Sequence, residues 1–111
     1  MIINFDAMPL QHLAHFKGGE GEVLANMHDD NMGKIARLEL PAGASIGLHT
    51  HTGNAEIMYL LSGSGVVLEN DDQPKPVQAG MVLYCPEGQT HSLVNNGTEP
   101  LVLLAVIPFV K

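Results

Sequence analysis

Short runs of β-favouring residues fill the chain, and glycine, proline, asparagine or aspartate separates each run from the next. The run at 34–40, KIARLEL, alternates: an alanine and two leucines share one face, while isoleucine, arginine and glutamate share the other. Such alternation is typical of strands with one buried face. Because many short strands follow at near-regular spacing, the pattern predicts an all-β sandwich or small barrel. The β-favouring runs lie at 22–28, 34–40, 46–51, 56–61, 65–69, 81–85, 91–95 and 100–109.

The expected arm, turns and last strand are consistent with one domain. Residues 1–13 fit a strand, an arm or a short helical turn, and 17–21 fit a loop, so 1–21 is expected to form an N-terminal arm or edge strand. The longest apolar stretch, 101–110, is expected to be a buried strand. No linker or repeat divides the chain, so we expect a single domain over 1–111. Turns are expected at 29–33, 62–65 and 70–72, where glycine, asparagine and aspartate gather.

The net charge of the chain argues against some classes of binding partner. Acidic residues outnumber basic ones by 12 to 5, which gives a net charge of −7. This argues against a nucleic-acid partner, because such proteins need a basic surface, and no basic cluster is present to attract anionic lipid. No apolar run approaches the roughly 20 residues of a membrane span, and a signal peptide is not expected. The single cysteine, Cys85, suits a reducing compartment, so we expect a soluble cytoplasmic protein.

Two histidines one residue apart, His49 and His51, lie in the segment GASIGLHTHTGNAE at 43–56. In an extended strand, residues i and i+2 project from the same face, so both imidazoles would occupy the same space. Glu56 opens the next run, and a hairpin-like return would bring its carboxylate beside them. Two imidazoles and a carboxylate suit a divalent transition metal. The alternative is a polar loop with a hydrogen-bonded histidine pair.

A second segment, GMVLYCPEGQTHSLVN at 80–95, favours the metal site. His91 follows a turn at Pro86–Gly88 and opens another strand. From a neighbouring strand it would complete a set of three histidines and one glutamate. Such a set leaves one or two coordination positions open for water, dioxygen or a substrate, as catalytic metal sites do.

These two segments resemble the two signature motifs of the cupin superfamily. All ten defined positions match in order, and the sixteen residues between the motifs are close to the short spacing of compact microbial cupins. The region 43–95 therefore carries both motifs. The first, G-x5-H-x-H-x4-E-x6-G, fits Gly43, His49, His51, Glu56 and Gly63. The second, G-x5-P-x-G-x2-H-x3-N, fits Gly80, Pro86, Gly88, His91 and Asn95.

The resemblance implies a fold and a set of ligands. It implies a small RmlC-like cupin domain, folded as a jelly-roll β-barrel of six to eight strands. It also implies that His49, His51, Glu56 and His91 converge inside the barrel on one divalent transition metal per chain, which could be iron, manganese, nickel or zinc. The motif glycines would occupy turns with unusual backbone angles, and Asn95 would support the second motif rather than bind metal.

The resemblance leaves the activity open between two classes. The first expectation is a metal-dependent enzyme, a dioxygenase, lyase or isomerase, acting on a small oxygenated molecule. The alternative is a non-catalytic cupin that binds or senses a small-molecule ligand. Small cupins usually pair through their sheet faces, so a homodimer is expected, with 101–110 available for the contact.

The other chemically active side chains are expected to lie outside the metal site. Arg37 either faces outward or reaches a pocket, where an arginine would anchor an anion. By alternation, Tyr59 faces away from Glu56. Either tyrosine, Tyr59 or Tyr84, could donate a proton to a substrate or pack in the core or an interface. His12, His15 and His28 are expected at the surface, and Cys85 is expected to be a small buried residue.

Overall fold

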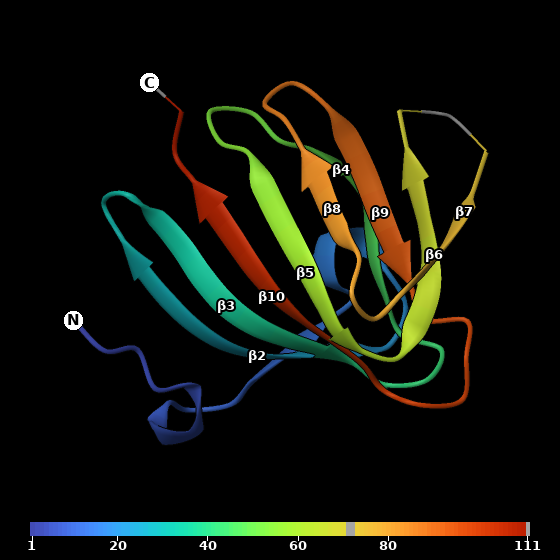
Figure 1. The fold of residues 1–111 in the computed structure, drawn as a ribbon, viewed down its shortest axis with the longest axis horizontal. Coiled ribbons are helices and arrows are strands. Elements are labelled where there is room, and N and C mark those ends of the chain that lie inside the picture. Colours follow the sequence, from blue (N-terminus) through green and yellow to red (C-terminus); the bar gives the residue numbers. More distant parts are fainter. Residues whose placement is uncertain (71–72, 111) are drawn as a thin grey trace.

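Two antiparallel sheets face each other in the computed structural model, which describes residues 1–70 and 73–110 (Figure 1). The larger sheet has the strand order β1-β2-β3-β10-β5-β8, and the smaller has the order β4-β9-β6-β7. Two 3₁₀ turns, η1 (Phe5–Ala7) and η2 (Phe16–Gly18), flank β1. The strands are β1 (Gln11–Ala14), β2 (Glu22–Asp30), β3 (Gly33–Leu40), β4 (Ser45–Thr50), β5 (Glu56–Ser62), β6 (Ser64–Glu69), β7 (Lys75–Gln78), β8 (Val82–Cys85), β9 (Thr90–Val94) and β10 (Leu101–Pro108).

The chain passes repeatedly from one sheet to the other, and this makes the fold a jelly roll. The all-β jelly-roll prediction is therefore confirmed. Alternate side chains of both sheets meet between them and form the core. In β3 the predicted alternation holds, since Ala36, Leu38 and Leu40 are buried while Arg37 and Glu39 are not. No helical segment within residues 1–70 and 73–110 has the length and apolar character needed to cross a membrane.

The described residues form ten strands, whereas the cupin resemblance implied six to eight. Two short strands, β1 and β7, account for the difference, and each lies at the edge of its sheet. Pro76 lies within β7, which is tolerated because an edge strand needs hydrogen bonds on one side only. β1 lies within the region 1–21, for which an arm or edge strand is expected, whereas β7 was not predicted, because Pro74 before it and Pro76 within it indicate a break in the chain.

The first hairpin turn is tighter than predicted. The turn expected at 29–33 contracts to residues 31–32, because β2 continues through Asp30 and β3 begins at Gly33. The Asp30 carboxylate accepts a hydrogen bond from the Met32 backbone N–H at 2.8 Å and contacts His28 Nε2 at 2.8 Å. Of the turn expected at 70–72, residues 71–72 lie outside the described residues.

The N-terminal arm packs on the outer face of the larger sheet, and Arg37 holds it there. Arg37 Nη2 donates to Asp6 Oδ1 at 2.9 Å and to Asn26 Oδ1 at 3.1 Å. The guanidinium carbon lies 5.6 Å from the centroid of the Phe5 ring, within cation–π range. Arg37 therefore faces outward, and on that face it also lines a pocket of about 270 Å³ that is separate from the candidate metal site.

The motif glycines adopt the backbone angles expected of them. Gly43, Gly63, Gly80 and Gly88 all have φ between +82° and +94°, a region that glycine enters at little cost. The turns at these four positions therefore follow from the motif residues themselves.

Asn95 supports the second motif through three hydrogen bonds, as expected. Its side chain is fully buried. Asn95 Nδ2 donates to the carbonyl oxygens of Leu40 at 2.8 Å and Glu99 at 2.9 Å, and Asn95 Oδ1 accepts from the Gly97 N–H at 3.0 Å. Asn95 therefore ties the end of β9 to the end of β3 and to the loop that leads into β10.

Replacing Asn95 by alanine is expected to lower the free energy of unfolding by about 2–4 kcal/mol, because buried backbone groups lose their partners. Urea denaturation followed by circular dichroism measures the change. The matched control is Asn96→Ala at the exposed neighbouring position, which should stay within about 0.5 kcal/mol of the parent. Equal stability of the two variants would contradict the role assigned to Asn95.

Candidate metal centre

The four sequence-predicted ligands come from three strands and one loop, and the fold brings them together. His49 lies in β4 and pairs in register with His91 in β9, while His51 follows directly after β4. Glu56 begins β5 in the other sheet. His51, Glu56 and His91 are buried, and His49 is partly buried. The predicted hairpin-like return through 52–55 therefore does bring the carboxylate beside the histidines.

A β-bulge in β4 turns both motif histidines inward. Ile46 pairs with Leu93 and His49 pairs with His91, so two residues of β4 lie opposite one residue of β9. Such an extra residue shifts the alternation of the strand by one position. As a result Ile46 is buried before the bulge, and His49 points to the interior after it.

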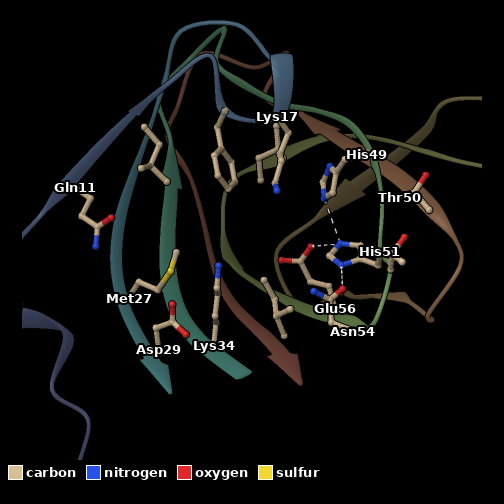
Figure 2. Close-up of a pocket in the computed structure, with 15 residues that line it drawn as sticks. Gln11, Lys17, Met27, Asp29, Lys34, His49, Thr50, His51, Asn54 and Glu56 are labelled. Atoms are coloured by element: carbon tan, nitrogen blue, oxygen red, sulfur yellow. Dashed lines mark hydrogen bonds and ion pairs between the residues drawn. The ribbon is translucent and has the colours of Figure 1, made fainter. Parts of the chain in front are cut away.

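One ligand atom from each of the four residues lies within 4.8 Å of the others. His51 Nε2 is 3.2 Å from His49 Nε2, 3.0 Å from His91 Nε2 and 3.1 Å from Glu56 Oε1. Glu56 Oε1 also lies 3.0 Å from His91 Nε2. Figure 2 shows part of this convergence, with His49, His51 and Glu56 directed at one another.

These distances fit a metal ion better than a set of hydrogen bonds. His51 Nε2 has three close neighbours, yet an imidazole nitrogen carries at most one hydrogen. Metal–ligand bonds of about 2.1 Å at right angles place neighbouring donor atoms about 3.0 Å apart. The four measured separations, 3.0–3.2 Å, match that spacing. Imidazole nitrogens and a carboxylate oxygen are also donors that first-row divalent ions accept.

Two hydrogen bonds behind the ligands hold the imidazole rings in place. His49 Nδ1 lies 2.7 Å from the Gly47 carbonyl oxygen, and His51 Nδ1 lies 2.7 Å from Asn54 Oδ1. Because both partners are oxygen acceptors, each Nδ1 is the N–H donor, and in the neutral imidazole each Nε2 then presents a lone pair to the centre. The sequence interpretation missed Asn54, since it had assigned 52–55 only as a short loop.

Glu56 supplies the negative charge of the four-residue cluster. Burial acts to raise the pKa of this carboxyl, but hydrogen bonds from His51 and His91 outweigh it and lower the pKa to about 2. The hydrogen bond to Glu56 in turn raises the pKa of His51. Burial lowers the pKa of His49, which favours its neutral form. The centre therefore offers an ionised carboxylate, and its imidazoles would present lone pairs to a metal once that metal displaces the protons that bond to Glu56.

The ligands border a cavity of about 580 Å³ between the two sheets. Leu13, Met27 and Ile107 contribute apolar surface, and Lys17, Lys34 and Asp29 contribute charge. Figure 2 shows Met27, Asp29 and Lys34 on the β2–β3 wall, across the space from His51 and Glu56. One side of the donor cluster is thus accessible to a small molecule.

The other candidate residues lie away from the four ligands. His12 contacts Glu22 at 3.0 Å at the surface, and His28 contacts Asp30. Tyr59 and Tyr84 are exposed on the outer face, where Tyr59 faces away from Glu56 as predicted. Cys85 is buried as predicted, and burial raises the pKa of its thiol to about 11. Neither tyrosine lines the metal-site cavity within the described residues.

A two-sheet jelly roll that holds three histidines and a glutamate at one point defines the cupin class. The sequence profile of the cupin domain matches residues 36–107, and the chain belongs to the cupin family. An oxalate-binding protein of Thermotoga maritima is 36% identical over 113 residues, which cover 96% of this chain and 93% of the relative.

Solved structures agree with this assignment. The crystal structure of a predicted oxalate decarboxylase from Thermotoga maritima matches with a TM-score of 0.92 at 34% identity, and the match covers 99% of this chain and 100% of the other. A polyketide cyclase from Streptomyces resistomycificus has a TM-score of 0.80 at 18% identity, with 97% and 78% covered. At that identity, the cyclase shares the fold alone.

Asn54→Ala is expected to weaken metal binding about 10- to 100-fold, because His51 loses the acceptor that orients its ring. The measurement is a competition titration of the purified protein with zinc against a chromogenic chelator. Asn54→Asp keeps an oxygen acceptor and should retain most of the affinity, and Asn96→Ala serves as a remote control. Unchanged affinity in Asn54→Ala would show that Asn54 does not orient His51.

Proposed function

We propose that this cupin binds one divalent transition metal through His49, His51, Glu56 and His91 and uses that site to hold a small oxygenated carboxylate. The observation that supports this is the convergence of four donor atoms beside an open cavity. A bound divalent ion supplies positive charge and open coordination positions for carboxylate oxygens. Iron, manganese, nickel and zinc all accept this donor set.

Oxalate is the first ligand to test. The relative from Thermotoga maritima that aligns along nearly the whole chain is named an oxalate-binding protein. The residues of this chain suit a compact anion, because the Gly47 carbonyl and Asn54 hold two imidazoles in place beside the cavity. Binding would therefore depend on a rigid site that is already formed.

The residues that line the cavity favour a protein that binds a ligand over one that converts it. Among the described residues that line it, the carboxylates are Glu56, assigned to the metal, and Asp29, on the exposed rim. No further carboxyl group of this part of the chain lines the cavity, so a general acid or base there would have to be Lys17 or Lys34. Catalysis by a dioxygenase, lyase or isomerase is the second candidate. It is supported by the similar structure from Thermotoga maritima, which is described as a predicted oxalate decarboxylase.

The metal-loaded protein is expected to bind oxalate, and the metal-free protein is not. Elemental analysis should find about one metal per chain, and isothermal titration calorimetry should show oxalate binding only in the loaded form. His51→Ala and Glu56→Ala should lose both properties, while His12→Ala at an exposed position should keep them. A protein that takes up none of the four metals would contradict the proposal.

Oxygen uptake and product analysis then separate binding from catalysis. Oxalate, diketones, catechols, thiols and sugar acids form the panel for the metal-loaded protein. Turnover that disappears in Glu56→Ala would establish the second candidate in place of a binding role.

We further propose that the chain forms a homodimer through the outer face of β10, β5 and β8. The N-terminal arm covers β2 and β3, but exposed apolar side chains remain on β5 and β8. Each copy carries a charge of −7, yet the outward positions of these three strands carry no charged residue. Two copies can therefore meet there without bringing like charges together. The exposed apolar residues are Ile57, Tyr59, Leu61, Val82 and Tyr84.

Light scattering coupled to size exclusion is expected to give about twice the chain mass of 11.9 kDa. Tyr59→Glu should shift the protein toward the monomer, because it buries a charge at the contact. Met32→Glu makes the same chemical change at an exposed residue of the β2–β3 turn and should leave the dimer intact. A monomeric parent protein at high concentration would rule out this contact.

A further inference from the structure

Lys17 lines the metal-site cavity from η2, a segment outside both cupin motifs. Figure 2 shows its side chain entering the cavity on the same side as His49, while Lys34 enters from β3. The Lys17 ammonium lies 5.6 Å from the centroid of the Phe16 ring, within cation–π range. A positive side chain thus faces the space in which a metal-bound molecule would lie.

The backbone that carries Lys17 is held in an uncommon conformation. His15 has φ 50° and Lys17 has φ 55°, and both are left-handed without being glycine. Such residues persist only where the surrounding structure enforces them, and they gather at ligand-binding and catalytic sites. Here His15 Nδ1 lies 3.1 Å from the Gly19 carbonyl oxygen, which closes the turn on itself.

Two glycines allow this turn to lie directly on β4. A Cβ at Gly47 would collide with the Lys17 carbonyl oxygen, and a Cβ at Gly19 would collide with the Ser45 carbonyl oxygen. Gly47 is also the residue whose carbonyl oxygen orients His49. The position of Lys17 is therefore coupled to the metal ligands through one residue of β4.

Of the two cations that line the cavity, Lys17 is the one without a carboxylate opposite it in a strand pair. Within residues 1–70 and 73–110, no ion pair involves its ammonium. Lys34, the other cation, lies opposite Asp29 in the β2–β3 register, so its charge has a cross-strand neighbour of opposite sign. The positive charge of Lys17 would therefore be the more available of the two for an anion bound in the cavity.

We propose that Lys17 binds the second anionic group of a ligand whose first group lies at the metal, so that the site selects dianions. This inference rests on the proposed function. A divalent ion with one carboxylate ligand keeps one net positive charge, and Lys17 adds another, which a dianion would balance. A cavity of about 580 Å³ also admits ligands larger than a two-carbon acid. The second group is a carboxylate or a phosphate, since a lysine ammonium binds either.

Three probes that share a 2-hydroxy acid head test the proposal by calorimetry on the metal-loaded protein. Glycolate has no second anionic group, malate has a second carboxylate, and 3-phosphoglycerate has a phosphate. We expect malate, 3-phosphoglycerate or both to bind about tenfold more tightly than glycolate, because the second anionic group gains a charge-assisted contact. The tighter of the two identifies the preferred group.

Lys17→Met should remove that advantage, and Lys17→Arg should restore most of it. Methionine keeps a long side chain on the same non-glycine backbone, so thermal unfolding should be unchanged. Lys75→Met, at an exposed β7 position outside the cavity lining, is the matched control and should bind all probes as the parent does.

Three outcomes decide the proposal. It is overturned if glycolate binds as tightly as malate and 3-phosphoglycerate, or if Lys17→Met keeps the preference for either of them. In either case oxalate binding by the same metal-loaded protein leaves the proposed function standing. If oxalate and all three probes fail to bind, the proposed function itself is wrong and this inference is rejected with it.

Discussion

The β-bulge at residues 47–48 is the constraint on which the candidate site depends. Before it, Ile46 points into the core; after it, His49 and His51 point inward, while Leu48 and Thr50 are exposed. In a regular strand, the alternation that buries Ile46 would turn both histidines outward. One extra residue in β4 therefore decides whether the cavity has a metal site or a patch of leucine and threonine. Bulges often occur beside functional sites for this reason.

The same bulge joins the candidate metal ligands to η2, the turn that carries Lys17. Gly47 offers its carbonyl oxygen to His49 Nδ1, and the space left by its missing side chain receives the backbone of Lys17. A larger residue here would push η2 away from β4 and move the carbonyl group that orients the ring. The orientation of the His49 ring and the position of Lys17 thus both depend on Gly47. The first cupin motif does not specify the residue at this position.

The sequence pattern predicted the parts of this protein that depend on local periodicity. Alternation placed Leu38 and Arg37 on opposite faces of β3, and the spacing of two placed His49 and His51 on one side of β4. The second argument holds despite the bulge, because His49 and His51 both come after it in the strand. Asn54 could not be recognised in this way, since its role depends on the path of a loop back to His51.

Lys17 illustrates the same limit more strongly. In the sequence it belongs to a glycine-rich loop, 17–21, and nothing in its spacing relates it to residues 49–56. The contact exists because η2 folds over β4, with two left-handed residues and two glycines making the approach close enough. Long-range packing of this kind leaves no periodic signal, whereas the edge strand β7 was missed only because it is short and contains Pro76.

The electrostatics of the cavity relate Glu56, the candidate metal site and Lys17 to one another. Glu56 is ionised and only 4% exposed, so the site has a fixed negative charge that water hardly screens. A cation bound against it is stabilised, and its excess charge attracts an anion on the open side. Lys17 lies on that side and would stabilise the far end of the same anion. Negative and positive groups would then alternate from the buried glutamate outward, so that each charge is next to one of opposite sign. A site ordered in this way would accept the metal and the anion together more readily than either alone, because each lowers the electrostatic free energy of the other.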